Sequence, residues 1–534
     1  MPTFAPVCGR PFWLPSLLLF VVVALAPFAV ARSEEAVFEV ETLRVAGRPV
    51  EVTPAWFGGS RAGHHQGLIV AFIRGSPPDQ VRGLALFAPG PSGRYAPDPT
   101  QILEIPGPVV AYDLVRDPGP AGDRVALLAA DQIRLVTPLA TGANEAIALD
   151  PPAPLPAPTR ELARLHFIDA WEGGSTLSAM VPTLQGGRIV HFDGSKGPFL
   201  SFPLLADYTM AGPGPPPQDE LLVSSIGWPG LARADDDGDG RLDLFALSRF
   251  SVWIFRLGPT GLPTTPTRRL TLRPFTAAEE LRHKATSLRL IARDLDGDGR
   301  ADLVIHRTSG TLLRSHSVTA VYRNRGEGVR LEDPPWLLLD ESDALSSADT
   351  IDLDGDGRAE LLSSKIAFGI VQVARALAMR RVEIELRVFP LGGPVGTSPK
   401  PSWTGSLSLP LDFSEGRVSA LLPTAEGDWN GDGRKDLLYG LARDEIAVHL
   451  GVAGEGGPGF GPRVATQHAP AQGLSCVADL DGDGLDDLVV YDPLDEKGAV
   501  EVLWNQGVLP GTAPRLRRAA ARDAPPAAKE GASP

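Results

Sequence analysis

Cysteine is nearly absent from this sequence, since its 534 residues include only Cys8 and Cys476. Cys8 lies in an N-terminal segment that we expect to be removed, so the mature chain would keep one thiol and form no internal disulfide. Cys476 stands directly before an acidic segment. We expect it to be a buried structural thiol and not a reactive one.

An excess of basic residues is also lacking, because 50 Lys and Arg face 65 Asp and Glu, for a formal net charge of −15. A nucleic-acid-binding protein generally needs a basic face, so we expect no nucleic-acid partner. Acidic side chains that gather in short clusters usually surround a cation, and such clusters do occur here.

Familiar catalytic motifs are missing. The chain contains no G-x-S-x-G, no H-E-x-x-H and no phosphate-binding glycine loop. Its nine histidines are scattered, and the single adjacent pair, His64 and His65, is expected in an exposed loop. These absences favour a protein that is not an enzyme. A catalytic site assembled from residues far apart in sequence stays an alternative.

Apolar runs long enough to cross a membrane are absent after the N-terminus. The first 31 residues carry one charge, Arg10, then the apolar run Leu17 to Leu25 and the cleavage pattern Ala29-Val30-Ala31. This pattern predicts a secretory signal peptide, residues 1–31, and a mature chain that is secreted, periplasmic or at the cell surface. An uncleaved anchor is the alternative, although the run is short for a hydrocarbon core of about 30 Å.

Five acidic nonapeptides of the pattern D-x-[DN]-x-D-G-x-x-[DE] recur in the second half of the chain. Their starting points lie 51 to 76 residues apart, and each runs into a short apolar, strand-like segment. They are Asp235 to Asp243, Asp294 to Asp302, Asp352 to Glu360, Asp428 to Asp436 and Asp479 to Asp487.

A period near 60 residues with about four short strands is typical of one propeller blade. The first half keeps this rhythm without the acids, at the strand Gly67 to Phe72 and the loops Asp117 to Asp123 and Asp169 to Gly174. We expect these three units to fold without metal. The sequence therefore predicts an all-β, seven- to eight-bladed β-propeller, with eight favoured by the repeat count.

The last repeat is too short to complete a blade, whereas Val37 to Arg44 is a spare strand at the other end of the mature chain. We expect this strand to join the last blade and close the ring, which removes open sheet edges. The propeller would span residues 36–508, with degenerate blades over 36–230 and acidic-loop blades over 231–508. Residues 509–534, rich in Ala, Arg and Pro, would form a disordered tail.

The acidic loops have the chemistry of a calcium site. Calcium takes six to eight oxygen ligands, and several carboxylates this close would repel one another without a cation. Glycines at positions 4 and 6 let the backbone turn tightly. An EF-hand is excluded by flanking strands and by the absence of Glu at position 12. A solvated acidic turn is the alternative for one copy, but not for five copies in register.

The loops resemble the calcium loop of the FG-GAP/VCBS repeat family, best known from the integrin α-chain propeller. Other segments resemble the family's "strand–N-x-G" turn and the "G-x-F-G-P" stretch that follows it. These are Tyr322 to Gly328 and Trp504 to Gly507 for the turn, and Gly459 to Pro462 for the stretch. The resemblance is strong from about Leu231 to Gly507 and implies about five calcium sites.

The resemblance also implies which atoms bind: side chains at positions 1, 3, 5 and 9, and the carbonyl at position 7. The side-chain ligands would be Asp235, Asp237, Asp239, Asp243, Asp294, Asp296, Asp298, Asp302, Asp352, Asp354, Asp356, Glu360, Asp428, Asn430, Asp432, Asp436, Asp479, Asp481, Asp483 and Asp487. The carbonyl ligands would come from Arg241, Arg300, Arg358, Arg434 and Leu485. Asn430 and Glu360 depart from the pattern, and we expect the Asn430 site to be the weakest.

These features favour a secreted calcium-binding propeller that acts as a non-enzymatic binding or scaffold module for a protein or glycan. A propeller-based polysaccharide lyase or hydrolase and a lectin are the alternatives. Eight tryptophans occur roughly once per blade, and we expect core positions for all except Trp429, which stands at position 2 of a loop. They are Trp56, Trp171, Trp228, Trp253, Trp336, Trp403, Trp429 and Trp504. The sequence identifies neither the ligand nor the oligomeric state.

Overall fold

The computed structural model describes most of the chain from Ala36 onward: residues 36–58, 65–75, 79–116, 122–140, 144–155, 163–210, 222–276, 279, 287–311, 314–392, 399–412, 414 and 417–512. The expected signal peptide lies outside the described residues, as do residues 513–534 of the expected tail. Strands dominate the described part, which contains one complete helix, α2 (Ile370–Met379).

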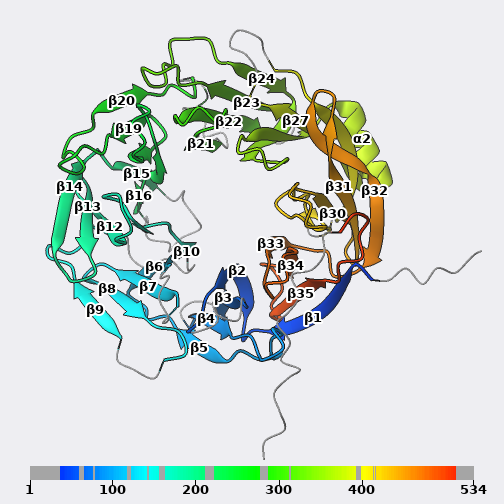
Figure 1. Ribbon diagram of the computed structural model, residues 1–534, viewed down its shortest axis with the longest axis horizontal. Coiled ribbons are helices and arrows are strands. Elements are labelled where there is room, and N and C mark those ends of the chain that lie inside the picture. The colour runs from blue at the N-terminus through cyan, green and yellow to red at the C-terminus, as the bar shows by residue number, and fades with distance from the viewer. Residues whose placement is uncertain are drawn as a thin grey trace, which may run out of the picture. The chain divides into compact units, whose positions relative to one another are not determined.

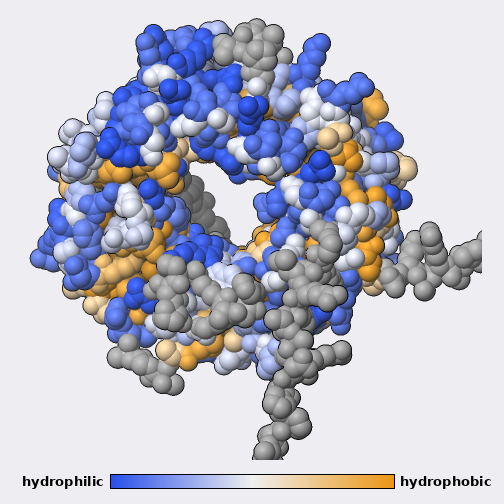
Figure 2. All heavy atoms as spheres, viewed as in Figure 1, coloured by the Kyte–Doolittle hydropathy of each residue, from blue (hydrophilic) through white to orange (hydrophobic). Residues whose placement is uncertain are grey.

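Eight small sheets stand side by side around a ring, each with one edge strand toward the centre (Figure 1). The prediction of eight blades is therefore confirmed. Figure 2 shows that the centre of the ring stays open on the viewed face. A separate hairpin, β15 (Leu205–Met210) with β16 (Leu222–Gly227), follows the third blade in sequence.

The first three blades come from the part of the sequence without acidic loops. Blade 1 contains β2 (Arg48–Ala55), β3 (Gly67–Arg74), β4 (Val81–Phe87) and β5 (Gln101–Glu104). Blade 2 contains β6 (Val109–Val115), β7 (Arg124–Ala129), β8 (Gln132–Val136), β9 (Glu145–Ala148) and the short parallel strand β10 (Ala163–Arg164) beside β6. Blade 3 contains β11 (Ile168–Asp169), β12 (Ser178–Thr183), β13 (Gly186–His191) and β14 (Lys196–Ser201).

The next three blades each carry one acidic loop between their first and second strands. Blade 4 contains β17 (Gly230–Ala234), β18 (Asp243–Leu247), β19 (Ser251–Phe255) and β20 (Arg268–Thr271). Blade 5 contains β21 (Ser287–Arg293), β22 (Asp302–Thr311), β23 (Arg314–Tyr322) and β24 (Leu337–Ser342). Blade 6 contains β25 (Ala344–Ile351), β26 (Glu360–Ala367), β27 (Arg381–Pro390), β28 (Trp403–Asp412) and β29 (Arg417–Val418).

The last two blades complete the ring. Blade 7 contains β30 (Leu437–Ala442), β31 (Glu445–Gly454) and β32 (Gly457–His468), and a single bridge from Thr424 to Leu438 takes the place of its first strand. Blade 8 contains β33 (Leu474–Ala478), β34 (Asp487–Tyr491), β35 (Ala499–Asn505) and, as its outermost strand, β1 (Phe38–Arg44).

The ring closes where the two ends of the propeller meet. β1 pairs antiparallel with β35 over its full length, from Phe38 opposite Asn505 to Arg44 opposite Ala499. The expected closure by the N-terminal strand is therefore confirmed. Without β1, blade 8 would expose the backbone of β35 as an open edge.

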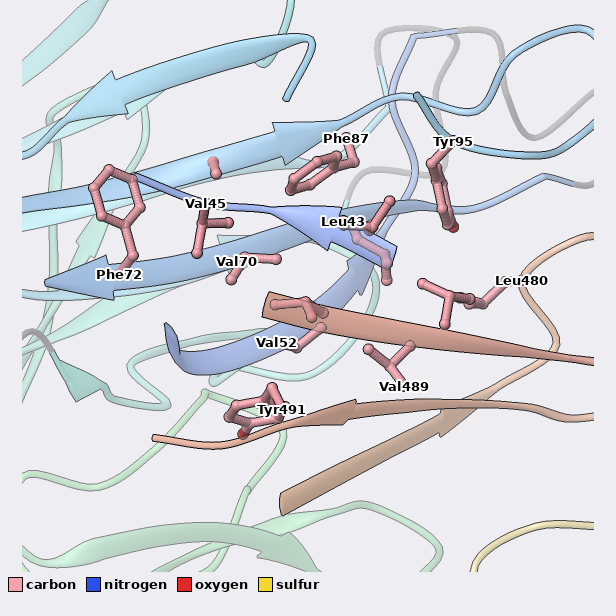
Figure 3. Packing of buried hydrophobic residues seen from close by; sticks show 14 of the residues in the cluster. Leu43, Val45, Val52, Val70, Phe72, Phe87, Tyr95, Leu480, Val489 and Tyr491 are labelled. Carbon is pink, nitrogen blue, oxygen red and sulfur yellow. The ribbon is translucent and has the colours of Figure 1, made fainter. Parts of the chain in front are cut away.

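The core lies between neighbouring blades, whose sheets face one another. Middle strands bury both faces, as in β3 and β34, so they are continuous apolar runs and do not alternate. Figure 3 shows the cluster at the closure, where Phe72 and Phe87 of blade 1 pack near Val489 and Tyr491 of blade 8. Each blade is thus stabilised by its neighbours and not by a core of its own.

Most of the tryptophans belong to this core, and the prediction for Trp429 is wrong. Its side chain is fully buried, and its ring stands edge-on to Phe38 with centroids 5.6 Å apart. The reason is that position 2 of each loop points between the blades: Leu295, Leu353 and Leu480 occupy the same position and are also buried.

Blade 6 is the most elaborated blade. It contains a long hairpin formed by β27 and β28, and β27 alternates between buried and more exposed residues. The sequence analysis did not anticipate α2, which connects β26 to β27 on the outer side of the ring (Figure 1). Val371, Leu377 and Met379 of this helix are exposed.

Candidate metal centres

The five acidic loops occupy equivalent places in consecutive blades. In blades 4, 5, 6 and 8 the loop connects the first strand to the second, and in blade 7 it directly precedes β30. In these five antiparallel blades the loop leads from the innermost strand, or from the Thr424 bridge in blade 7, into the next strand, so all five loops leave their sheets at the same end. The loops therefore share one face of the propeller.

The carboxylate at position 1 folds each loop around itself. In blade 5, Asp294 accepts hydrogen bonds from the backbone N–H groups of Gly297 at 2.8 Å and Gly299 at 2.9 Å. The same two bonds are made by the other four residues at this position, Asp235, Asp352, Asp428 and Asp479. The ten glycines at positions 4 and 6 have φ between 70° and 88°, as predicted, and this region favours glycine.

The carboxylate at position 5 fixes the next turn by accepting the backbone N–H of position 7. Distances are 2.9 Å for Asp239, 2.8 Å for Asp298 and 3.0 Å for Asp483. Asp356 and Asp432 do the same in the remaining two loops. The loops therefore hold the same shape five times, with several carboxylates on one side.

The acid at position 9 is the most buried of the predicted ligands, and it has a structural role that the sequence analysis did not assign. Asp302 is 2% exposed and accepts the backbone N–H of Leu295 at 3.2 Å and of Asn324 at 2.7 Å. Asp243, Asp436 and Asp487 make the corresponding pairs of bonds. Glu360 accepts the N–H of Leu353 at 2.9 Å, so the longer side chain fills the same role.

Four of the five loops bring three carboxylates together, with one oxygen of each within 4.8 Å of the others. The groups are Asp235 with Asp237 and Asp239, Asp294 with Asp296 and Asp302, Asp352 with Asp354 and Asp356, and Asp479 with Asp481 and Asp483. In the fifth loop Asn430 stands in place of an acid. The Oδ1 atom of Asn430 accepts the backbone N–H of Asp432 at 3.2 Å, and its Nδ2 donates to the Asp432 carboxylate at 3.2 Å.

The electrostatics of these clusters favour a bound cation. Burial, together with the nearby charges of Asp298 and Asp294, raises the pKa of Asp302 to about 7, although the two backbone N–H groups that it accepts lower the pKa. Burial likewise raises the pKa of Glu360 and of Asp436 to about 7. A divalent cation would relieve this repulsion and stabilise the charged forms.

The donor set fits calcium in two further respects. All candidate ligand atoms are hard oxygens, the kind that calcium prefers. Within the described residues, a carboxylate oxygen is buried without a hydrogen-bond partner in two loops, Oδ1 of Asp237 and Oδ1 of Asp354. Such an atom is costly unless a cation or another donor meets it. The residues present therefore fit the ion that the repeat family implies.

Neighbouring loops are hydrogen-bonded to one another, which the sequence analysis missed. The residue at position 8 donates its backbone N–H to a carbonyl of the preceding loop: Ala301 to Asp235 at 2.6 Å, and Ala359 to Leu295 at 3.0 Å. Lys435 and Asp486 repeat this contact with Leu353 and Asp428. The five loops therefore form a continuous hydrogen-bonded row.

The row is reinforced by the asparagine of the N-x-G turn and extends across the closure. Asn324 Nδ2 donates to the carbonyl of Asp236 in the preceding blade at 2.8 Å, and Asn505 Nδ2 donates to that of Trp429 at 2.8 Å. In blade 1, Gln66 donates to Leu480 O at 2.8 Å. His65, predicted to lie in an exposed loop, is half-buried and contacts Asp481 O through Nδ1 at 2.9 Å.

The degenerate blades place guanidinium groups beside their acids. Arg116 of blade 2 pairs with the buried Asp123 at 2.7 Å, and Arg233 of blade 4 pairs with Asp169 of blade 3 at 3.2 Å. Residues 117–121 of the predicted loop lie outside the described residues. In these blades an arginine side chain balances the charge of the acid, which is consistent with loops that need no metal.

Two cavities lie at opposite ends of blade 6. One, of about 340 Å³, adjoins the acidic loop and is lined by Asp354, Asp356 and Glu360 together with residues of blades 5 and 7. The other, of about 980 Å³, lies beneath α2, where β26 turns into β27. The loop before β26 and the helix after it lie at opposite ends of the strand, so the cavities open on different faces.

The Cys476 thiol is less buried than the sequence analysis predicted. Cys476 is partly buried against the closure core, and burial raises the pKa of its thiol to about 11. It therefore stays protonated at neutral pH, in agreement with an unreactive structural role. Among the described residues, no helix has the length and apolar character needed to cross a membrane.

One of the repeats matches a known protein family. The family model described as FG-GAP-like repeat matches residues 294–363, which contain the acidic loops of blades 5 and 6. A search of curated protein sequences finds no significant match.

Two solved structures align with most of this chain at low sequence identity. The V. cholerae biofilm matrix protein Bap1 shares 11% identity over 90% of this chain and 92% of its own, with a TM-score of 0.41. The WD40 domain of SCAP from fission yeast shares 9% identity over 88% of this chain and 94% of its own, with a TM-score of 0.27. Scores this low do not bear on the fold, which rests on the strand pairing described above. The matched repeat and the ring of eight blades together identify this chain as an FG-GAP repeat β-propeller.

Proposed function

We propose that this protein is an exported calcium-binding propeller that serves as a non-enzymatic binding or scaffold module for a protein or glycan ligand. The observation that carries the proposal is the row of acidic loops on one face, with identical folding of each loop and clustered, partly unpartnered carboxylates. Export is supported by the N-terminal sequence pattern alone.

Calcium would act here as a structural ion. A bound ion would supply the positive charge that the clustered carboxylates lack. The chain's own residues supply the remaining rigidity, through the bonds from positions 1 and 5 to the backbone. Extracellular calcium modules typically bind in the range of about 10⁻⁴–10⁻³ M, which suits ions that are always present outside the cell.

A role in binding and not in catalysis is supported by how the acids are used. The position-9 acids accept backbone hydrogen bonds, and the position-1 and position-5 acids hold the loops in shape. A lectin that uses its tryptophans is less well supported, because Trp171, Trp253, Trp429 and Trp504 are all at most 4% exposed. Recognition would then depend on the faces of the ring and their cavities.

Calcium removal tests the proposal. Adding calcium to the chelated protein should raise its melting temperature, because an ion that binds only the folded state stabilises it by about 2.7 kcal/mol at a hundred times its Kd. Scanning calorimetry with and without a chelator measures the shift, and metal analysis after dialysis should find about five ions per chain. A melting temperature indifferent to both additions would contradict the calcium assignment.

A further inference from the structure

The acidic loop of blade 6 differs from its neighbours in what surrounds it. It adjoins the cavity of about 340 Å³, which is lined by Asp354, Asp356 and Glu360 on one side. Part of the opposite wall comes from residues with small side chains or none: Pro390 at the end of β27, and Gly456 and Gly457 in the turn between β31 and β32. Those glycines leave room beside the carboxylates where longer side chains would fill it.

The carboxylate at position 3 shows the difference most clearly. In blade 4 Oδ2 of Asp237 pairs with Arg256 at 3.4 Å although its Oδ1 is unpartnered, and in blade 5 Asp296 pairs with Arg323. Both arginines directly follow the third strand of their blade. In blade 6 the third strand ends at Pro390, and the described residues give Asp354 no hydrogen bond or ion pair.

Two carboxylates that line this cavity therefore each keep an oxygen to which the described residues donate no hydrogen bond. Oδ1 of Asp354 is buried and unpartnered. Glu360, 4% exposed, lines the same cavity while only its Oε2 accepts the N–H of Leu353. Buried carboxylates of this kind are costly unless a cation meets them.

Arg358 adds a positive charge to the cavity wall. In the other arginine-bearing loops, the position-7 side chain pairs with the position-5 acid of its own loop, as Arg300 does with Asp298 at 3.5 Å. Arg358 extends instead toward Gly392, with Nη1 3.1 Å from where a Cβ on that glycine would stand. Both residues line the cavity, and no ion pair involves Arg358 within the described part of the chain.

We propose that this cavity binds one residue of an acidic sugar, a uronate, whose carboxylate and neighbouring hydroxyl oxygens complete the coordination of the blade-6 calcium. The inference rests on the proposed calcium-binding function. Calcium accepts six to eight oxygens, more than one nonapeptide supplies with its side chains and one carbonyl. Arg358 pairs with the sugar carboxylate, and the proline-lined wall covers the apolar face of the ring.

The volume of the cavity favours a single sugar unit over a larger ligand. A cavity near 340 Å³ is at the lower end of small-molecule sites and suits a single sugar unit of a chain that continues into solvent. Blade 5 has a loop identical at eight of nine positions, yet it carries Arg323 on its position-3 acid. We therefore expect binding at blade 6 and not at blade 5.

The test uses the full chain saturated with calcium, with D-glucuronate as probe and D-glucose as neutral control, followed by saturation-transfer NMR. Gly456→Leu should fill part of the cavity and replaces no predicted calcium ligand, and a Cβ there meets no atom closer than 3.7 Å. Arg358→Gln removes the guanidinium, and Arg300→Gln is the matched control in blade 5. We expect glucuronate but not glucose to bind, Gly456→Leu and Arg358→Gln each to weaken binding about tenfold or more, and Arg300→Gln to leave it unchanged.

The calcium-dependent shift in melting temperature distinguishes a failure of calcium binding from a failure of glucuronate binding. If calcium stabilises the wild type and glucuronate does not bind, the cavity assignment is wrong and the proposed function stands. If calcium has no effect, both fail. Glucuronate binding that persists in chelator, or that Gly456→Leu leaves intact, would overturn the site. So would a tetra-aspartate peptide that binds at blade 6 where glucuronate does not, because the cavity would then recognise acidic peptides.

Discussion

At the scale of single residues, the acids of one loop have different roles although they look alike in sequence. Asp302 is buried and holds two backbone N–H groups, whereas Asp298 is exposed and accepts one N–H from Arg300. The first is part of the folded sheet and also belongs to the blade-5 carboxylate group, whereas the second lies outside that group and adds negative charge beside the proposed calcium site. Position 9 should therefore matter even without metal, and position 5 should matter chiefly with it.

This difference can be measured by chemical denaturation in excess chelator. Asp302→Ala should lower the free energy of unfolding by about 1–3 kcal/mol for each buried N–H left without an acceptor. Asp298→Ala should cost only about 0.5 kcal/mol under the same conditions, as for other surface changes. In calcium both variants should lose stability. Equal losses in chelator would show that position 9 has no separate structural role.

At the scale of elements, each loop depends on the blade that follows it. Asn324 reaches from the end of β23 to the carbonyl of Asp236 in blade 4, while its own Oδ1 accepts the N–H groups of Gly326 and Gly328. One side chain thus closes its own turn and holds the neighbouring loop. Because the bond is buried, its loss should be transmitted to the proposed calcium site of blade 4.

Asn324→Asp separates these two roles, since it keeps the turn acceptor and removes the donor to Asp236. We expect a loss of about 1–3 kcal/mol in unfolding free energy, because the carbonyl of Asp236 loses a buried partner. The matched control is Arg325→Ala in the same turn, which leaves Asn324 and its bonds in place. Calcium titration by calorimetry should find one weakened site in the Asp variant and none in the control. Unchanged affinity at every site would refute coupling between blades.

At the scale of the whole molecule, the ring is held shut by one strand from the other end of the chain. β1 contributes Phe38 and Leu43 to two inter-blade clusters and covers the edge of β35. The closure lies beside the blade-8 loop, where Gln66 bonds to the carbonyls of Asp479 and Leu480. Strand pairing and the proposed calcium binding would therefore stabilise the same junction.

Removing residues 36–44 should open this junction. The truncated chain should melt at a lower temperature and associate through the exposed edge of β35, since open edges pair with other chains. Calorimetry and light scattering would measure both effects. A synthetic peptide of residues 36–46 should restore the monomer, and a peptide of the same composition in scrambled order is the control. A truncated chain that stays monomeric with an unchanged melting temperature would show that β1 is dispensable.

The fold and the shape of the loops were largely determined by the sequence itself. Asp at position 1 and glycines at positions 4 and 6 close the loop through bonds between residues at most five apart, so the pattern was sufficient to predict it. The repeat count predicted eight blades, and a spare N-terminal strand predicted the closure, because an open propeller edge is unfavourable.

Only the tertiary structure decided what each loop meets. Trp429 is buried because position 2 points between blades, Asp296 is paired because Arg323 follows β23, and Asp354 is unpaired because β27 ends at Pro390. These partners come from other strands and other blades, many residues away along the chain. The loops of blades 5 and 6 have nearly the same nine residues and differ in their surroundings. That difference, and not the motif, distinguishes the blade-6 site that we propose for sugar binding from the other loops.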